Sequence, residues 1–224
     1  FFANRALNKV SKLIKDWENA GRPEDADISC MKGEFLIRKG DLESAIEVLS
    51  RIHPRTTYNL EYLTGNAYFL AAAGNPLNLI FAHNHLNLAT TIDPHSWWAR
   101  TNLIHVLAIL GRQQSPPVRV DQVMLNEHRA RAWESLEKER IAHPRMFSVR
   151  LYRLALAMAF DDKILFEKLI AEDATFFETG QLGITYIFPQ SLIGRLKLLY
   201  SHDAEAKIYY ENGLYRWLAS IASK

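Results

Sequence analysis

Residues 24–54 read EDADISCMKGEFLIRKGDLESAIEVLSRIHP, and this stretch decides the fold class of the chain. Apolar residues recur at three- and four-residue steps on both sides of Gly40-Asp41, which predicts two helices joined by a tight turn. Gly40 allows the positive φ angle of such a turn, and the Asp41 carboxylate can accept hydrogen bonds from the first amides of the next helix. His53-Pro54 ends the second helix. The stretch therefore predicts a helical hairpin, with helices at about 24–39 and 42–52.

Small residues in this hairpin indicate how its two helices pack. Gly33 and Ala45 lie 12 residues apart, and their small size would let two antiparallel helices approach closely. The same spacing separates Gly194 from Ala206 near the end of the chain. The pattern resembles the tetratricopeptide (TPR) repeat family, on these residues: Gly33, Gly40, Asp41, Ala45, Ile46, Leu49 and Ile52. This resemblance implies an all-α fold, a right-handed superhelix of helix–turn–helix repeats.

The same helical pattern extends outward in both directions. An amphipathic helix is predicted at 1–20, where Leu7, Val10, Ile14 and Trp17 share one face. The remaining repeats are degenerate, so residues 1–224 are interpreted as a single TPR-like domain. Its units are expected at about 24–54, 57–94, 97–144, 147–173 and 190–213.

The array is irregular in its turns and spacing. Asp161-Asp162 replaces the Gly-Asp turn in the fourth unit, and Asp121 is expected to cap a long, charged helix. The prolines expected to close the repeats recur at intervals of 40, 50 and 45 residues, against ~34 in a regular TPR. They are Pro54, Pro94, Pro144 and Pro189. Residues 175–188 do not fit the pattern and are interpreted as an irregular connector.

Composition excludes several classes of function. The formal net charge is +2, from 27 basic and 25 acidic residues, so no general electrostatic attraction to nucleic acid is expected. Cys30 is the single cysteine, which excludes an intrachain disulfide and a thiolate metal cluster. His83 and His85 would splay apart on a helix, and the acidic pairs, among them Glu172-Asp173, are expected to cap helices. We therefore expect no enzymatic activity in this segment, no cofactor and no metal.

The resemblance also implies where a partner would bind. In TPR stacks the first helix of each unit lines an inner groove, which suits an extended peptide or a helix of a partner protein. The groove positions carried over are Glu34, Arg38, Asn59, Tyr62, Asn66, Phe69, Trp98, Thr101 and His105. Ile37, Leu151 and Ala155 fall on the same faces. If these residues prove structural, the next candidate is the Pro116-Pro117 loop with the charged helix that follows it.

The function expected is therefore that of a non-catalytic protein–protein interaction scaffold. An alternative is the C-terminal TPR-like domain of a bacterial polytopic membrane glycan ligase or polymerase, of the O-antigen-ligase or pilin-glycosylase type. In that alternative, Phe1-Phe2 would end a membrane helix and the chain would be tethered upstream. No span is expected within the segment itself, because no apolar stretch approaches ~20 residues. The sequence leaves the compartment open between cytoplasm and periplasm.

Overall fold

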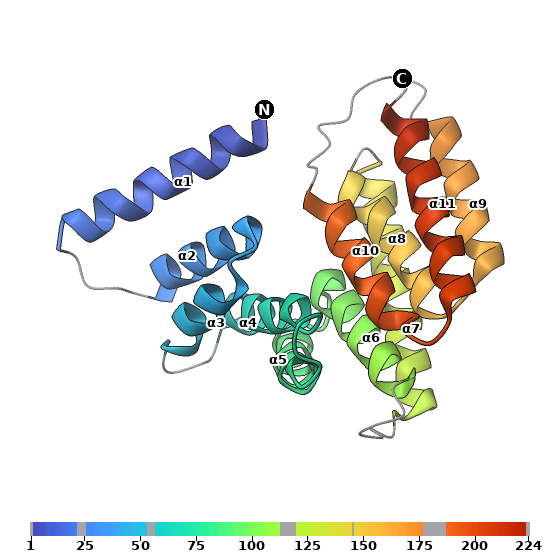
Figure 1. Cartoon of the computed structure of the whole chain (residues 1–224), viewed down its shortest axis with the longest axis horizontal. Coiled ribbons are helices and arrows are strands. Elements are labelled where there is room, and N and C mark those ends of the chain that lie inside the picture. The colour runs from blue at the N-terminus through green and yellow to red at the C-terminus, as the bar shows by residue number, and fades with distance from the viewer. Residues whose placement is uncertain are drawn as a thin grey trace. The chain divides into compact units, whose positions relative to one another are not determined.

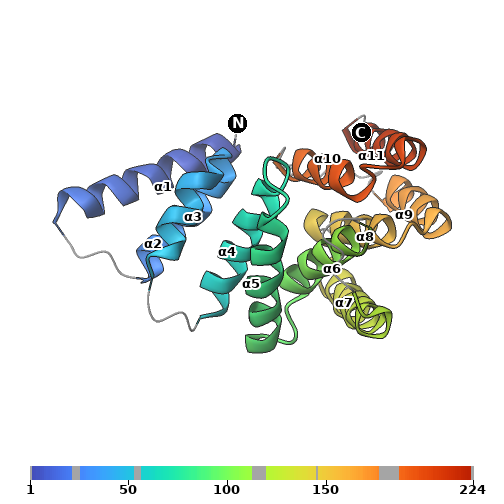
Figure 2. The ribbon, with the colours of Figure 1, turned by 60° about the horizontal axis from the view of Figure 1, so that its bottom comes forward.

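The computed structural model describes residues 2–21, 26–52, 57–112, 120–144, 146–176 and 187–222, and the regular structure in these ranges is entirely α-helical. Contacts divide the chain into two compact units, Phe1–Pro94 with α1–α5 and His95–Lys224 with α6–α11 (Figures 1 and 2). The helices are α1 Phe2–Asn19, α2 Ala26–Lys39, α3 Leu42–Ser50, α4 Tyr58–Ala71, α5 Asn78–Ile92, α6 Trp97–Arg112, α7 Gln122–Ala142, α8 Phe147–Ala159, α9 Lys163–Phe176, α10 Ile187–Leu199 and α11 Ala204–Ala222. The predicted all-α class is confirmed for these residues.

The turn residues act locally as the sequence predicts. Gly40 has a φ angle of +81°, and the Asp41 carboxylate accepts a hydrogen bond from the Ser44 amide at 3.3 Å. Asp121 caps α7 by accepting from the Val123 amide at 2.8 Å. Each cap satisfies a backbone donor that the first turn of a helix cannot pair internally.

The Asp161-Asp162 turn also has the predicted role. Asp161 adopts a φ angle of 53°, the left-handed conformation that glycine takes at Gly40. Asp162 then caps α9, because its carboxylate accepts from the Leu165 amide at 3.0 Å. The Asp161 side chain has a second use, since the Tyr210 hydroxyl donates to it at 2.8 Å. This bond ties the α8–α9 turn to α11.

In the first unit, glycines let side chains of the next helix reach the backbone. A Cβ added at Gly33 would lie 2.6 Å from Leu49 Cγ, and one added at Gly65 would lie 2.7 Å from Leu86 Cγ. Ala45 is fully buried, as predicted, but the close approach at Gly33 is to Leu49. Packing in this unit therefore depends on leucines of α3 and α5 seated over glycines of α2 and α4.

Replacing Gly65 with alanine is expected to destabilise the protein by about 1–3 kcal/mol, because the new methyl group would overlap Leu86. The Leu86 backbone nitrogen, only 3.1 Å from that position, limits relaxation. Gly194→Ala is the matched control, since an added Cβ there meets nothing within 4 Å. In a helix this control should stabilise by about 0.5–1 kcal/mol. Urea unfolding measures both, and equal effects of the two substitutions would contradict the described packing.

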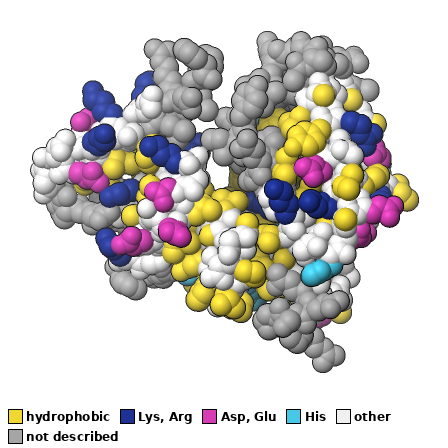
Figure 3. Space-filling model, in the orientation of Figure 1, with side chains coloured by type: hydrophobic (Ala, Val, Ile, Leu, Met, Phe, Trp, Pro, Cys, Tyr) yellow, Lys and Arg dark blue, Asp and Glu magenta, His cyan; other side chains and the backbone are white. Residues whose placement is uncertain are grey.

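Helix α5 exposes large apolar side chains on its outer side, among the exposed polar residues Asn84, Asn87 and Thr91. Its inner residues Leu79, Ala82 and Leu86 are fully buried. Its outer side leaves Phe81 49% and Leu88 43% exposed. Figure 3 shows hydrophobic side chains gathered at the lower centre of the molecule, where Figure 1 places α5.

The second unit is built around α6, α8 and α10, which pack against one another, while α9 packs against α11 (Figure 2). Helix α8 is buried at every position from 149 to 159. Aromatic pairs join the helices: Phe147 stacks on Trp217 with ring centroids 5.1 Å apart, and Phe166 meets Tyr210 edge-on at 4.9 Å. A helix that is apolar on nearly all sides, such as α8, is expected in the interior.

Two predictions near the C-terminus are wrong. Ala206 is buried as expected, but Gly194 is no close-approach position, since a side chain there would meet open space. Pro189 does not close a repeat, because it lies in the first turn of α10, where proline is tolerated. Pro94 and Pro144 do follow the ends of α5 and α7. The interior of the predicted connector, residues 177–186, and the Pro116-Pro117 loop lie outside the described residues.

Candidate functional site

Five of the predicted groove residues lie at the surface of the first unit. Glu34 and Arg38 pair with each other on α2, with Arg38 Nε 3.0 Å from Glu34 Oε1. On α4, Asn59 is exposed and Tyr62 is half-buried, stacked on Tyr58 with ring centroids 5.8 Å apart. Asn66, also on α4, is half-buried. Partner binding by these residues stays a prediction.

Three other groove residues are interior, and their expected exposure is wrong. Phe69 is only 1% exposed, and Thr101 and His105 are fully buried. The physical reason on α6 is that this helix packs against both α8 and α10, so few of its faces meet solvent. Trp98 is half-buried, with its ring stacked 3.9 Å from that of Trp97. Ala155 and Leu151 on α8 are buried as well.

The buried His105 takes part in contacts that join helices of the second unit. Its Nε2 lies 2.7 Å from the Ala155 carbonyl oxygen, so the neutral ring donates this proton to α8. Burial, and then the nearby Arg195 charge, lowers the pKa of His105 to about 3. Arg195 itself, from α10, donates to the Asn102 side-chain oxygen at 2.8 Å. This cluster joins α6, α8 and α10.

A groove of about 850 Å³ opens along α7 in the second unit. Residues from 126 to 141 of α7 line it at helical spacing, and α9 adds Leu165. The lining residues are Asn126, Arg129, Ala130, Trp133, Glu134, Glu137, Lys138, Ile141 and Leu165. Ile141 is 72% exposed and Trp133 is half-buried. The groove therefore combines apolar contacts with charged groups of both signs.

Charged residues of the groove are held in place by ion pairs. Lys138 Nζ lies 2.8 Å from Glu134 Oε1, an ion pair at four-residue spacing on the exposed face of α7. Arg129 donates to Asp162 at 2.9 Å and lies over the Phe160 ring, 4.4 Å from its centroid. The Arg129 contacts are partly buried, whereas the Lys138–Glu134 pair is solvent-exposed, with side chains 74% and 66% exposed.

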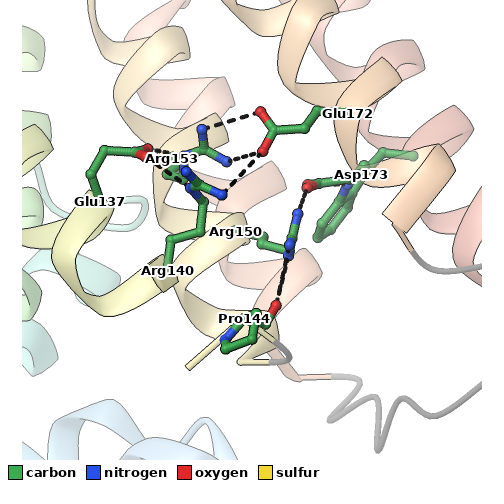
Figure 4. Close-up of polar contacts among 8 residues, drawn as sticks. Glu137, Arg140, Pro144, Arg150, Arg153, Glu172 and Asp173 are labelled. Carbon is green, nitrogen blue, oxygen red and sulfur yellow. Dashed lines mark hydrogen bonds and ion pairs between the residues drawn. The ribbon is translucent and has the colours of Figure 1, made fainter. Parts of the chain in front are cut away.

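Two residues that line the groove contact an arginine of α8, Arg153, whose ion pairs are drawn in Figure 4. Arg153 Nε lies 2.7 Å from Glu137 Oε1, and its two terminal nitrogens pair with the two carboxylate oxygens of Glu172 at 3.2 and 3.3 Å. Its guanidinium also lies over the Trp133 ring, 5.3 Å from the centroid. Arg140 closes the cluster by donating to Glu137 at 2.8 Å. One side chain thus orients two groove residues, Trp133 and Glu137.

A second arginine of α8 makes a deeper ion pair (Figure 4). Arg150 pairs with Asp173, and the two side chains are 2% and 1% exposed. Arg150 also donates to the Pro144 carbonyl at 3.2 Å, and Trp217 Nε1 donates to Asp173 at 2.9 Å. Helices α8, α9 and α11 and the end of α7 therefore meet at one polar cluster. Three arginines face three carboxylates in the two clusters together.

The pKa values of the two neighbouring carboxyls are shifted in opposite directions. Burial raises the pKa of Asp173, against the hydrogen bonds from Arg150 and Trp217. Burial also raises the pKa of Glu172, but the hydrogen bonds and charge of Arg153, with the charges of Arg140 and Arg150, bring it below its ordinary value. Glu172 is therefore charged at neutral pH, which keeps Arg153 seated under Trp133.

The sequence did not predict this network. Glu172-Asp173 was expected to cap a helix, but α9 continues to Phe176 and the pair faces the two arginines. The capping prediction is wrong, because both carboxylates pair with arginines of α8. Glu172 pairs with Arg153, 19 residues away in sequence, and Asp173 pairs with Arg150, 23 residues away. The one available signal was Arg150 and Arg153 at three-residue spacing in an otherwise apolar helix, which requires buried counter-charges.

Neither the described side chains nor comparison with known proteins assigns this chain to a family or a reaction. Among the described residues, no three His, Cys, Asp or Glu side chains are grouped so that they could hold a metal ion. No helix in the described ranges has both the length and the apolar character needed to cross a membrane. Protein-family models, curated proteins and solved structures give no match to this chain. The TPR resemblance therefore stays a prediction from the sequence.

Proposed function

We propose that this chain is a non-catalytic protein-interaction module that binds a helix of a partner protein in the α7 groove. The observation that carries the proposal is the groove itself, which is lined by the apolar side chains of Ala130, Trp133, Ile141 and Leu165 and by charged side chains of both signs. Helix-in-groove recognition uses this combination, in which apolar side chains supply affinity and polar groups fix register.

The length of the groove suits a partner helix. Its lining runs from Asn126 to Ile141 on one face of α7, which corresponds to about 22 Å at 1.5 Å per residue. A partner helix of about four turns could lie beside this face. Trp133 and Ile141 would provide the apolar anchors, because aromatic and large aliphatic groups supply most of the energy in such interfaces. Arg153 holds the Trp133 ring in place before a partner arrives, which reduces the entropy lost on binding.

We further propose that the helical hairpins are TPR-like repeats of a right-handed superhelix. The support is the succession of five hairpins, α2–α3 to α10–α11, at the positions where the sequence predicts repeat units. Within the second unit, α6 packs against α8 and α8 against α10, as neighbouring first helices do in such a stack, although α6 also packs against α10, which a regular superhelix keeps apart. The proposed site differs from the predicted one, because α7 is the second helix of its hairpin.

Site-specific photo-crosslinking tests the binding proposal. A photoreactive amino acid at Ile141, in the groove, should capture a defined partner in cells of the source organism. The matched control is Ile208, which is 56% exposed on α11 and does not line the groove. Adding Ala130→Arg, which fills the groove with a long side chain, should remove the product at Ile141. The same products at Ile141 and Ile208, or no effect of Ala130→Arg, would contradict the proposal.

A further inference from the structure

The outer side of α5 is an uncharged surface with several exposed apolar side chains. The run from Gly74 to Ile92 contains no Asp, Glu, Lys or Arg. Four side chains of one stripe are exposed: Leu77 by 58%, Phe81 by 49%, Leu88 by 43% and Ile92 by 41%. Ile80, 39% exposed, lies beside them. An exposed helix of a water-soluble surface usually carries charges on this side, so the uncharged stripe indicates a contact surface.

The stripe has an internal symmetry. Leu77 and Phe81 are four residues apart, as are Leu88 and Ile92, and the midpoint of the four falls at Asn84 and His85. If a second copy of α5 lay antiparallel with its midpoint opposite this one, Phe81 would face Leu88 of the second copy. Leu77 would likewise face Ile92 of the second copy. In this register Asn84, whose Oδ1 lies 3.3 Å from His83 Nδ1, would face His85 of the second copy, so the middle of the contact is polar and uncharged residues flank it on both sides.

We propose that α5 is a self-association surface, on which two copies of the chain pair antiparallel about a two-fold axis near Asn84. Charge argues for a second copy over a charged partner, because a partner with charges here would bury them against a surface without counter-charges. A second copy brings no charge to the interface. An isologous contact requires a self-complementary patch, and the symmetric stripe is one. This proposal is independent of the groove on α7.

The size of the surface determines how tightly the dimer is expected to associate. The stripe is about 22 Å long and a helix is about 10 Å wide, so its footprint is far below the ~800 Å² per partner of a stable complex. The dimer is therefore weak and reversible, with half-dissociation expected at micromolar concentrations or above. Sedimentation equilibrium over a range of concentrations should show a monomer–dimer exchange.

A charge-swap experiment tests both the surface and its register. Phe81→Lys and Leu88→Glu should each weaken self-association at least tenfold, because each buries two unpaired charges in the dimer. Mixing the two variants should restore a heterodimer, since the lysine at 81 then faces the glutamate at 88. Leu77→Lys mixed with Ile92→Glu repeats the test at the outer positions. Ile208→Lys, an exposed isoleucine in the second unit, is the control and should self-associate like the unaltered protein.

The charge-swap results distinguish the proposed antiparallel pairing from its alternatives. Restored association in both mixtures, with helical content unchanged by circular dichroism, supports the antiparallel pairing. A protein that remains monomeric at all concentrations, or variants that associate as strongly as the unaltered protein, would overturn it. Association that the single charges abolish but the mixtures do not restore would also overturn the proposed register.

Discussion

Replacing Arg150 with leucine is expected to lower the free energy of unfolding by about 3–5 kcal/mol at pH 7. The substitution leaves the Asp173 carboxylate buried without its guanidinium partner, and Trp217 alone cannot balance the charge. Urea unfolding, followed by tryptophan fluorescence, measures the loss. Arg38→Leu breaks an ion pair whose two side chains are 50% and 47% exposed, and it should cost only about 0.2–1 kcal/mol.

The double variant Arg150→Leu/Asp173→Leu separates the charge from the shape of the side chains. With both charges removed, much of the loss should be recovered, because two apolar groups need no counter-charge. The loss in Arg150→Leu should also shrink as the pH falls. Without the arginine, the pKa of Asp173 rises further, so protonation in the folded state relieves the buried charge. A loss no greater than that of Arg38→Leu would show that the network does not stabilise the unit.

Replacing His105 with glutamine is expected to reduce the acid sensitivity of the protein by about 2 kcal/mol between pH 7 and pH 5. The pKa of His105 falls from an ordinary 6.5 to about 3 in the folded state. Between these values the unfolded chain binds a proton that the folded chain does not, so stability falls as the pH falls below 6.5. Glutamine cannot titrate, and its amide can still donate to the Ala155 carbonyl.

Unfolding free energies at pH 7 and pH 5, for both proteins, measure this difference. The comparison is between pH dependences, so a change in absolute stability from the substitution cancels. His143→Gln is the control for the substitution itself, because this histidine is exposed at the surface. If His105→Gln keeps the full acid sensitivity of the unaltered protein, His105 is not held neutral in the interior.

The sequence predicted those parts of the fold that depend on neighbouring residues. Gly40-Asp41, Asp121 and Asp161-Asp162 each act within a few residues of chain, through a φ angle or a cap. These interactions are encoded locally, so helix positions and turn types could be predicted from one sequence. Gly194 shows the limit, because its spacing to Ala206 matches the first unit while its surroundings do not.

The site depends on contacts between distant parts of the chain. His105 was expected to face a groove, and only the packing of α6 against α8 and α10 places it inside. Arg150 and Asp173 are 23 residues apart, and Arg195 and Asn102 are 93 apart. No periodicity specifies which carboxylate a buried arginine meets. The sequence did indicate the charged helix α7 as the next candidate for partner binding. The groove beside α7 could not be predicted, because it also depends on where Leu165 of α9 lies in the folded chain.

The most direct test of the central proposal is the affinity of the crosslinked partner for groove variants, measured by isothermal titration calorimetry. Ile141→Asp places a charge among the apolar contacts, at a position exposed enough to leave the unfolding midpoint nearly unchanged. We expect it to weaken binding at least tenfold, a change of about 1.4 kcal/mol, while Ile208→Asp binds like the unaltered protein. Equal affinities for the unaltered protein and Ile141→Asp would contradict binding in the α7 groove.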